Sequence, residues 1–179
     1  PIQLCLMTAQ IANGGYKITP KILTDDNQLT SEQVKRAMLN NNNEKPFEKL
    51  FKEQKNIKIV QDSMFGSTNE LRGTSYKSRI DDPKYQFAGK TGTAQVKRIS
   101  KRERELDLKT SQIPYEERDH ALYVAFGPYK NPRYSLSIIV EHGGSGSSAA
   151  APMATKLFKL IIDRHELRKQ VSDFKEFNI

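Results

Sequence analysis

The sequence predicts an α+β fold, in which helices are followed by an antiparallel sheet and then by a long closing helix. In the first 66 residues, apolar side chains recur every three or four positions, which is the spacing of a helix. From residue 85 onward, segments rich in β-branched and aromatic residues alternate with turn-forming segments, which is typical of strands. The 179 residues suffice for one domain with a hydrophobic core, and the sequence contains no internal repeat.

The first helix is expected at residues 2–12, whose apolar residues have helical spacing. It ends at Asn13-Gly14-Gly15, residue types that accept a left-handed backbone. Pro1 suits a first-turn position, so we expect the chain to be a piece of a longer protein that starts at a helix. Residue types alternate along residues 16–23, which predicts a short extended segment.

Further helices are expected before the sheet. Residues 31–39 read as a capped helix with a hydroxyl residue at its N-cap. Apolar residues at 47–51 indicate a short amphipathic helix, and those at 57–65 indicate another that ends near Gly66.

Strands are expected at residues 85–96, 121–126 and 134–141, which are rich in β-branched and aromatic residues. The last two are joined by the turn-forming residues 127–133, which favour an antiparallel hairpin. The charged residues 97–119 then form a loop that leaves the first strand.

The closing helix is expected to begin at Ser147 or Ser148, after a glycine-rich entry at residues 143–146. Its buried stripe is predicted to consist of four large apolar residues, and the pattern continues into a polar tail. These four residues are Met153, Leu157, Leu160 and Ile161.

The segment Ala88-Gly89-Lys90-Thr91-Gly92-Thr93-Ala94-Gln95 combines residue types that suit ligand binding. Lys90 and Thr91 can bind a carboxylate through charge-assisted hydrogen bonds. Because side chains alternate along a strand, both serve one ligand only if this strand lies at a sheet edge. Glycine in a strand marks a close approach, as expected at Gly92, and the Thr93 N–H is placed to stabilise an oxyanion. The alternative is an ordinary strand that contains Lys and Thr.

Other motif matches in the sequence are weaker. A nucleotide-binding P-loop needs glycine where Lys84 stands, so that interpretation is rejected. Ser172 and Lys175 have the Ser-x-x-Lys spacing but lie in the C-terminal tail. Ser67-Thr68-Asn69 fits Ser-x-Asn, yet it follows the expected helix end and is interpreted as capping or turn chemistry. Residues 143–147 miss the nucleophile-elbow pattern.

Metal and cofactor sites are not expected. His120, His142 and His165 have no metal-ligand spacing, and we interpret them as structural or exposed. Cys5 is the single cysteine, which excludes an internal disulfide, and its apolar surroundings indicate a small core residue.

The charge composition limits the classes of partner that the chain can have. Lys and Arg number 29 against 21 Asp and Glu, which gives a net charge of +8 and a pI near 9.5. The densest basic run, at residues 97–104, contains no aromatic residue, so a solvated loop is favoured over a nucleic-acid surface. No apolar run approaches the roughly 18 residues that a membrane span requires.

Several of these segments together resemble the class B penicillin-binding proteins, and most of all their elongation-type branch, penicillin-binding protein 2. The segments match in order from residue 1 to about residue 162. They are Pro1 to Leu4, Ala9 to Gly15, Thr19-Pro20, Gly73-Thr74, Ala88 to Gln95, His120 to Phe126, Val140 to Gly144, and Ala150 to Pro152.

The resemblance implies the C-terminal part of a penicillin-binding-protein/β-lactamase-like transpeptidase domain, spanning residues 1–179. It implies a serine D,D-transpeptidase that cross-links peptidoglycan stem peptides and is acylated by β-lactams. Lys90, Thr91 and Gly92 would serve substrate binding, and Thr93 both substrate binding and the oxyanion hole. The nucleophile and its lysine would lie upstream of Pro1, outside this chain, so the piece alone is expected to be inactive.

The resemblance also implies the periplasmic face of the bacterial inner membrane, with the anchor outside this chain, and no cofactor. Its partners would be a SEDS-type glycosyltransferase and the elongation machinery, through regions outside this chain, with no nucleic acid. Two alternatives stay open at this point. One is a non-catalytic β-lactam-sensing or binding module of the same fold, and the other is a basic nucleic-acid-binding domain.

Overall fold

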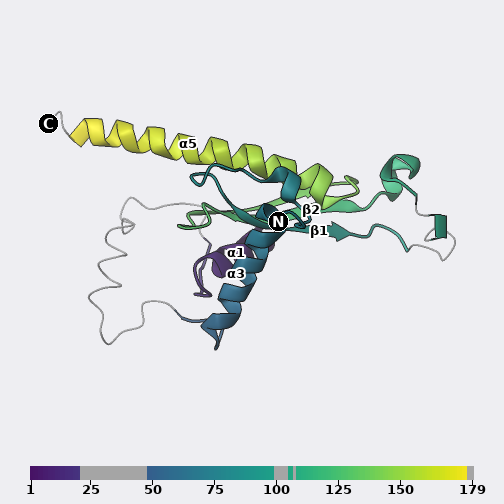
Figure 1. The fold of residues 1–179 in the computed structure, drawn as a ribbon, viewed down its shortest axis with the longest axis horizontal. Helices are drawn as coiled ribbons and strands as arrows, with labels where there is room; N and C mark the ends of the chain where they lie inside the picture. Colours follow the sequence, from purple (N-terminus) through teal and green to yellow (C-terminus); the bar gives the residue numbers. More distant parts are fainter. Residues whose placement is uncertain (21–47, 99–104, 107, 177–179) are drawn as a thin grey trace.

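A computed structural model describes residues 1–20, 48–98, 105–106 and 108–176, with side chains described up to residue 168 (Figure 1). Its sheet contains β1 (Ala88–Ala94), β2 (His120–Gly127) and β3 (Tyr134–Val140), in the order β1-β2-β3. Both neighbouring pairs are antiparallel, and the predicted hairpin is confirmed. The α+β class and the three strands are therefore confirmed, with strand bounds that differ from the predicted ones by up to three residues.

Helices lie on both sides of this sheet (Figure 1). The helices α1 (Ile2–Ala12) and α3 (Gln54–Asn69) lie on one side, and the long α5 (Ala151–Glu176) lies on the other. The bounds of α1 are those predicted. The predicted helix at 31–39 lies outside the described residues.

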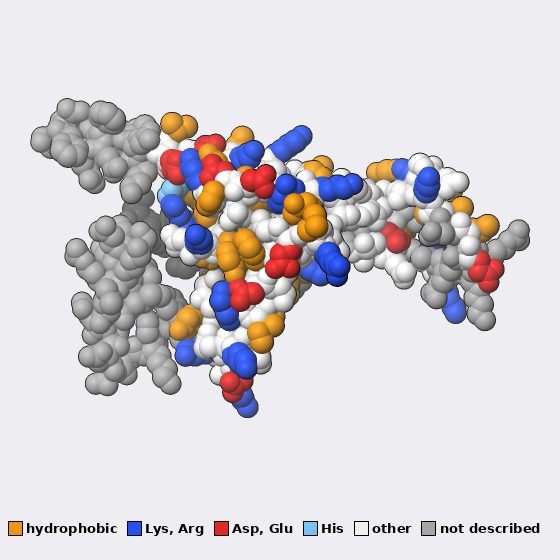
Figure 2. All heavy atoms as spheres, in the orientation of Figure 1, with side chains coloured by type: hydrophobic (Ala, Val, Ile, Leu, Met, Phe, Trp, Pro, Cys, Tyr) orange, Lys and Arg blue, Asp and Glu red, His pale blue; other side chains and the backbone are white. Residues whose placement is uncertain are grey.

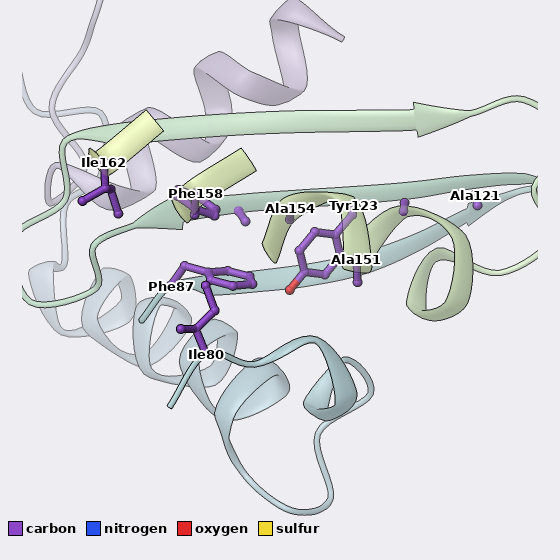
Figure 3. Close-up of a cluster of buried hydrophobic side chains, with 10 residues drawn as sticks. Ile80, Phe87, Ala121, Tyr123, Ala151, Ala154, Phe158 and Ile162 are labelled. Carbon is purple, nitrogen blue, oxygen red and sulfur yellow. The ribbon is translucent and has the colours of Figure 1, made fainter. Parts of the chain in front are cut away.

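The core on the α5 side is built around aromatic rings (Figure 3). Phe87 stacks on Phe158 with ring centroids 4.8 Å apart and meets Tyr123 edge-on at 6.4 Å. Small residues of α5 fill the rest of this layer, which lets the helix approach the sheet closely. The other side of the sheet has a smaller core of Met64, Ala88 and Phe126.

The predicted buried stripe of α5 is wrong. Met153, Leu157 and Leu160 are 47%, 40% and 63% exposed, and Ile161 is only partly buried. The helix instead buries a stripe displaced by one or two positions, which contains Ala151, Ala154, Phe158 and Ile162. Both stripes have helical spacing, and the sequence pattern favoured the one with more large residues. The structure selects the one whose alanines fit against the sheet.

The start of the closing helix also differs slightly from the prediction. A π-helical turn, η4 (Gly146–Ala150), precedes α5, so helical structure begins at Gly146 rather than at Ser147 or Ser148. Gly146 lies against the sheet backbone, because a Cβ there would be 2.3 Å from the Leu122 oxygen and 2.7 Å from the Gly92 oxygen. Only glycine permits this contact.

Two predictions in the first half are wrong. No helix occurs at residues 48–53, because the backbone there pairs with the chain that follows α1. Lys49 forms a bridge with Tyr16, and the Leu50 N–H donates to the Gly15 oxygen at 2.9 Å. The other error concerns α3, which continues through Gly66 to Asn69.

Cys5 is half-buried rather than a core residue, and its Sγ lies 3.2 Å from the Ser135 Oγ. The described part of the connection at 97–119 contains two short 3₁₀ turns, η2 (Thr110–Gln112) and η3 (Tyr115–Glu117), which lie away from α1, α3 and α5 (Figure 1). In the described part of the chain, no helix is long and apolar enough to cross a membrane. Basic side chains are spread over the face visible in Figure 2 and are interspersed with acidic and apolar ones.

Candidate functional site

The Lys-Thr-Gly segment forms β1, which is the edge strand of the sheet that the structure describes. Strand geometry alone would direct Lys90 and Thr91 to opposite faces. The Lys90 stem folds back over the edge, however, and its Nζ donates to the Thr91 carbonyl oxygen at 2.9 Å and to Thr91 Oγ1 at 3.4 Å. The structure thus brings an ammonium group and a hydroxyl together at one strand edge.

The Lys90 ammonium has no acidic partner among the residues that the structure describes, and its side chain is exposed. Other lysines in the fold do form ion pairs, such as Lys84 with Asp163 and Lys58 with Asp62. A ligand carboxylate that reaches Lys90 therefore does not have to displace a carboxylate of the described fold. Such a contact would be a charge-assisted hydrogen bond.

A groove of about 620 Å³ opens beside Lys90, between β1, α3 and the chain that follows α3. It is open to solvent, and its lining carries hydroxyls and charges of both signs beside apolar surface. The lining includes Asp62, Ser67, Glu70, Arg72, Thr74 and Lys90.

A line of hydroxyl groups crosses this groove from α3 to β1. Ser67 Oγ lies 3.1 Å from Thr74 Oγ1, and Thr74 Oγ1 lies 3.4 Å from Thr91 Oγ1. In the sequence, Gly73-Thr74 is visible only as part of a family resemblance, which assigns no role to the Thr74 hydroxyl. Residues 67, 74 and 91 are too far apart in sequence for any spacing rule to connect them.

Ser67-Thr68-Asn69 is not the cap or turn that the sequence predicted, since it forms the last turn of α3. Its side chains nevertheless have structural partners. The Asn69 Nδ2 donates to the Phe87 oxygen at 2.9 Å, just before β1 begins. Thr68 is fully buried and hydrogen-bonds the Tyr123 hydroxyl at 2.9 Å. Asn69 and Thr68 thus fix α3 to β1 and β2.

The segment that carries Thr74 is held tightly against the end of α3. A Cβ at Gly73 would be 2.4 Å from the Ser67 oxygen, so only glycine fits there. The next residue, Ser75, is buried, and both its N–H and its Oγ donate to the Ser67 oxygen at 3.0 Å. Thr74 therefore has a defined position beside β1.

Tyr123 of β2 supports β1 from the α5 side. Its ring is fully buried and its hydroxyl contacts Thr68 at 2.9 Å and Ser75 at 3.1 Å. Burial raises the pKa of this hydroxyl, while its hydrogen bonds with Ser75 and Thr68 lower it. A Cβ at Gly89 would be 2.2 Å from the same oxygen, so Gly89 is required by packing beneath the motif.

Gly92 and Thr93 form the other end of the motif. A Cβ at Gly92 would meet only the Leu122 Cβ, at 3.2 Å. Thr93 pairs with Ala121 of β2, and its side chain is exposed. Along an edge strand every second N–H faces away from the sheet, where it is available to a ligand.

The remaining sequence candidates lie elsewhere. Ser172 and Lys175 fall in the last turns of α5, where side chains are not described. Of the glycine-rich residues 143–147, the first three form the turn that leads into η4 and the last two already belong to η4. His142 has a left-handed backbone (φ 54°), and its N–H donates to His120 Nδ1 at 3.0 Å, so these two histidines hold that turn together. No group of three or more metal-ligating side chains occurs in the described residues.

The fold and the motif at its edge strand define a class of protein. Residues 1–159 match the family described as the penicillin-binding protein transpeptidase domain, and the chain belongs to this family. Peptidoglycan D,D-transpeptidase MrdA of Salmonella typhimurium is 31% identical over 163 residues, which cover 91% of this chain and 25% of that protein. The Haemophilus influenzae protein of the same name is 28% identical over all 179 residues of this chain, and the match covers 25% of that protein.

Solved structures of penicillin-binding proteins also superpose on this chain. Penicillin-binding protein 2 of Pseudomonas aeruginosa, in complex with WCK 5153, superposes with a TM-score of 0.61 at 32% identity, covering 89% of this chain and 29% of that one. Penicillin-binding protein 2 of Helicobacter pylori, in complex with MreC, superposes with a TM-score of 0.60 at 28% identity, covering 93% and 25%. The recognised family is thus confirmed, and the chain spans about a quarter of the length of the curated relatives it matches.

Proposed function

We propose that these 179 residues are the C-terminal portion of the transpeptidase domain of a peptidoglycan D,D-transpeptidase that cross-links stem peptides during cell-wall elongation. The observation that carries this proposal is the Lys90 ammonium beside the Thr91 hydroxyl, at the strand edge where a groove opens. Within the described residues this ammonium has no acidic partner. A stem peptide and a β-lactam both offer a carboxylate to such a pair.

In this proposal β1 recognises the ligand and does not attack it. Lys90 and Thr91 bind the terminal carboxylate, Gly92 allows close approach, and the Thr93 N–H supplies one donor of the oxyanion hole. The nucleophilic serine and its lysine come from residues outside this chain. The serine attacks the carbonyl of the penultimate residue, the terminal D-alanine leaves, and the amine of a second stem peptide resolves the acyl-enzyme.

The curated relatives named D,D-transpeptidase support the substrate class. The Helicobacter pylori structure is a complex of penicillin-binding protein 2 with MreC, and it supports a partner of that kind in the elongation machinery. We further propose a SEDS-type glycosyltransferase as a second partner of the protein. Its proposed location is the periplasmic face of the inner membrane. Both assignments depend on parts of the protein outside this chain.

The test is labelling of the full-length protein with a fluorescent penicillin. The wild-type protein is expected to be labelled covalently at a serine outside residues 1–179, as mass spectrometry of the labelled peptide would show. Lys90→Ala should slow labelling at least about tenfold, because a charge-assisted bond to the carboxylate is lost. Labelling that proceeds equally well without Lys90 would contradict the assigned role. A protein that no penicillin labels would instead favour a non-catalytic module.

A further inference from the structure

We propose that Thr74 is a third donor to the carboxylate that Lys90 and Thr91 bind, which makes it a specificity-determining residue for carboxylate ligands. This inference rests on the proposed function. It adds a residue from outside the Lys-Thr-Gly strand, carried by the segment that follows α3.

Thr74 lies close to the groups that are proposed to bind the carboxylate. Thr74 Oγ1 lies 3.4 Å from Thr91 Oγ1 and lines the same groove as Lys90. Its side chain is exposed toward that groove rather than packed in the core. A carboxylate held by Lys90 and Thr91 therefore comes within reach of the Thr74 hydroxyl.

A carboxylate bound by Lys90 and Thr91 can accept a further hydrogen bond. An ionised carboxylate has two oxygens with about four acceptor positions, whereas Lys90 already directs two of its three N–H groups to Thr91, so Lys90 and the Thr91 hydroxyl leave acceptor positions open. The contacts that Thr91 Oγ1 makes with Lys90 and Thr74 are both 3.4 Å, which is long for a hydrogen bond to oxygen. Contacts of this length at a binding site often tighten only when the ligand arrives.

The protons of the three hydroxyls can rearrange when a carboxylate binds. Before a ligand binds, the Thr91 hydroxyl can donate to Thr74, whose own proton then goes to Ser67 at 3.1 Å. When a carboxylate binds, the Thr91 and Thr74 protons both turn to it. Ser67 then donates its proton to Thr74 Oγ1, so each of the three hydroxyls keeps a partner.

Thr74 is preorganised by its neighbours in the chain. Gly73 lies against the last turn of α3, where a Cβ would be 2.4 Å from the Ser67 oxygen, and Ser75 is buried and bonded to the Tyr123 hydroxyl at 3.1 Å. The residues on either side of Thr74 are therefore fixed, and its hydroxyl needs little reorganisation to meet a ligand. A donor held in this way contributes more to recognition than a mobile one.

The experiment compares two ligands that differ in one charge. In the full-length protein, the rate constant of acylation is measured with benzylpenicillin and with its neutral methyl ester, for the wild type, Thr74→Val and Thr74→Ser. We expect Thr74→Val to lower the rate constant for benzylpenicillin about tenfold and to leave that for the ester within about twofold. The serine variant keeps a hydroxyl and should restore the rate to within about twofold of the wild type.

Thr19→Val is the matched control, because Thr19 is an exposed threonine that does not line the groove. It should leave both rate constants unchanged, and thermal unfolding should show whether Thr74→Val remains folded. Equal losses with both ligands, or no loss with benzylpenicillin, would overturn the role of Thr74. A wild-type protein that neither ligand acylates would show that the proposed function itself is wrong, and the inference would fail with it.

Discussion

The hydroxyl of Tyr123 lies directly beneath Gly89, so that a Cβ at position 89 would be 2.2 Å from the phenol oxygen. The tyrosine cannot move aside easily, because its ring is fully buried and its hydroxyl is bonded to Thr68 and Ser75. This relationship couples the first glycine of the Lys-Thr-Gly strand to the segment that carries Thr74. The two walls of the groove therefore depend on one buried side chain.

Gly89→Ala is expected to destabilise the full-length protein by about 1–3 kcal/mol, since overpacking forces the strand or the tyrosine to shift. The free energy of unfolding from urea titration measures this loss. Gly92→Ala is the matched control for stability, because its Cβ would meet only the Leu122 Cβ at 3.2 Å. Equal losses in the two variants would contradict the packing argument.

Tyr123→Phe removes the hydroxyl that Thr68 and Ser75 share, and it leaves these two buried groups with fewer partners. We expect a loss of about 1–3 kcal/mol in the free energy of unfolding. Tyr115→Phe is the control, because Tyr115 is 56% exposed and its ring lies against His142 without any hydrogen bond from its hydroxyl in the described structure. A Tyr123→Phe protein as stable as this control would show that the buried hydroxyl cluster contributes nothing.

The sequence predicted those elements whose amino-acid composition alone identifies their secondary structure. The three strands carry β-branched and aromatic residues, and the motif at β1 has no competing interpretation of equal strength. The contacts that complete the site were not predictable, because Ser67, Thr74 and Thr91 meet only through the packing of α3 against β1. A hydroxyl residue at a turn has many ordinary roles, and spacing alone does not select among them.

The error in α5 has a different physical cause. The helix carries two apolar stripes of similar spacing, and the one that packs on the sheet includes the small residues Ala151 and Ala154. Alanine adds little to a hydrophobic pattern but allows close approach, which only the partner surface can reveal. The continuation of α3 through Gly66 is a similar case, since its helical hydrogen bonds override the low helix propensity of glycine.

Phe158→Ala tests which stripe of α5 is buried. The ring is fully buried and stacks on Phe87 at 4.8 Å, so its removal leaves a cavity in the core. We expect a loss of about 3–5 kcal/mol in the free energy of unfolding. Lys156→Ala, an exposed position on the same helix, should change it by no more than about 0.5 kcal/mol. A small effect at Phe158 would contradict the observed packing.

Asp163 on α5 gives a pH-dependent contribution to stability. Hydrogen bonds from the Tyr85 hydroxyl and then from Lys84 hold the pKa of its carboxyl below the ordinary value of 3.8. A carboxyl with a lowered pKa stabilises the fold at pH values above 3.8, and this contribution is lost as the pH falls through the folded-state pKa. Wild type and Asp163→Asn should therefore differ in unfolding midpoint at neutral pH and converge in strong acid. A difference that persists in strong acid would contradict this linkage.

Gly146→Ala tests whether η4 supports the ligand-binding strand. A Cβ there would be 2.3 Å from the Leu122 oxygen and 2.7 Å from the Gly92 oxygen, so alanine must push η4 and β1 apart. Because small displacements of a binding strand are costly, acylation of the full-length protein by benzylpenicillin should slow about tenfold to a hundredfold. Ser148→Ala, an exposed position in the same turn, should leave the rate unchanged. An unchanged rate in a folded Gly146→Ala protein would mean that β1 keeps its geometry without support from η4.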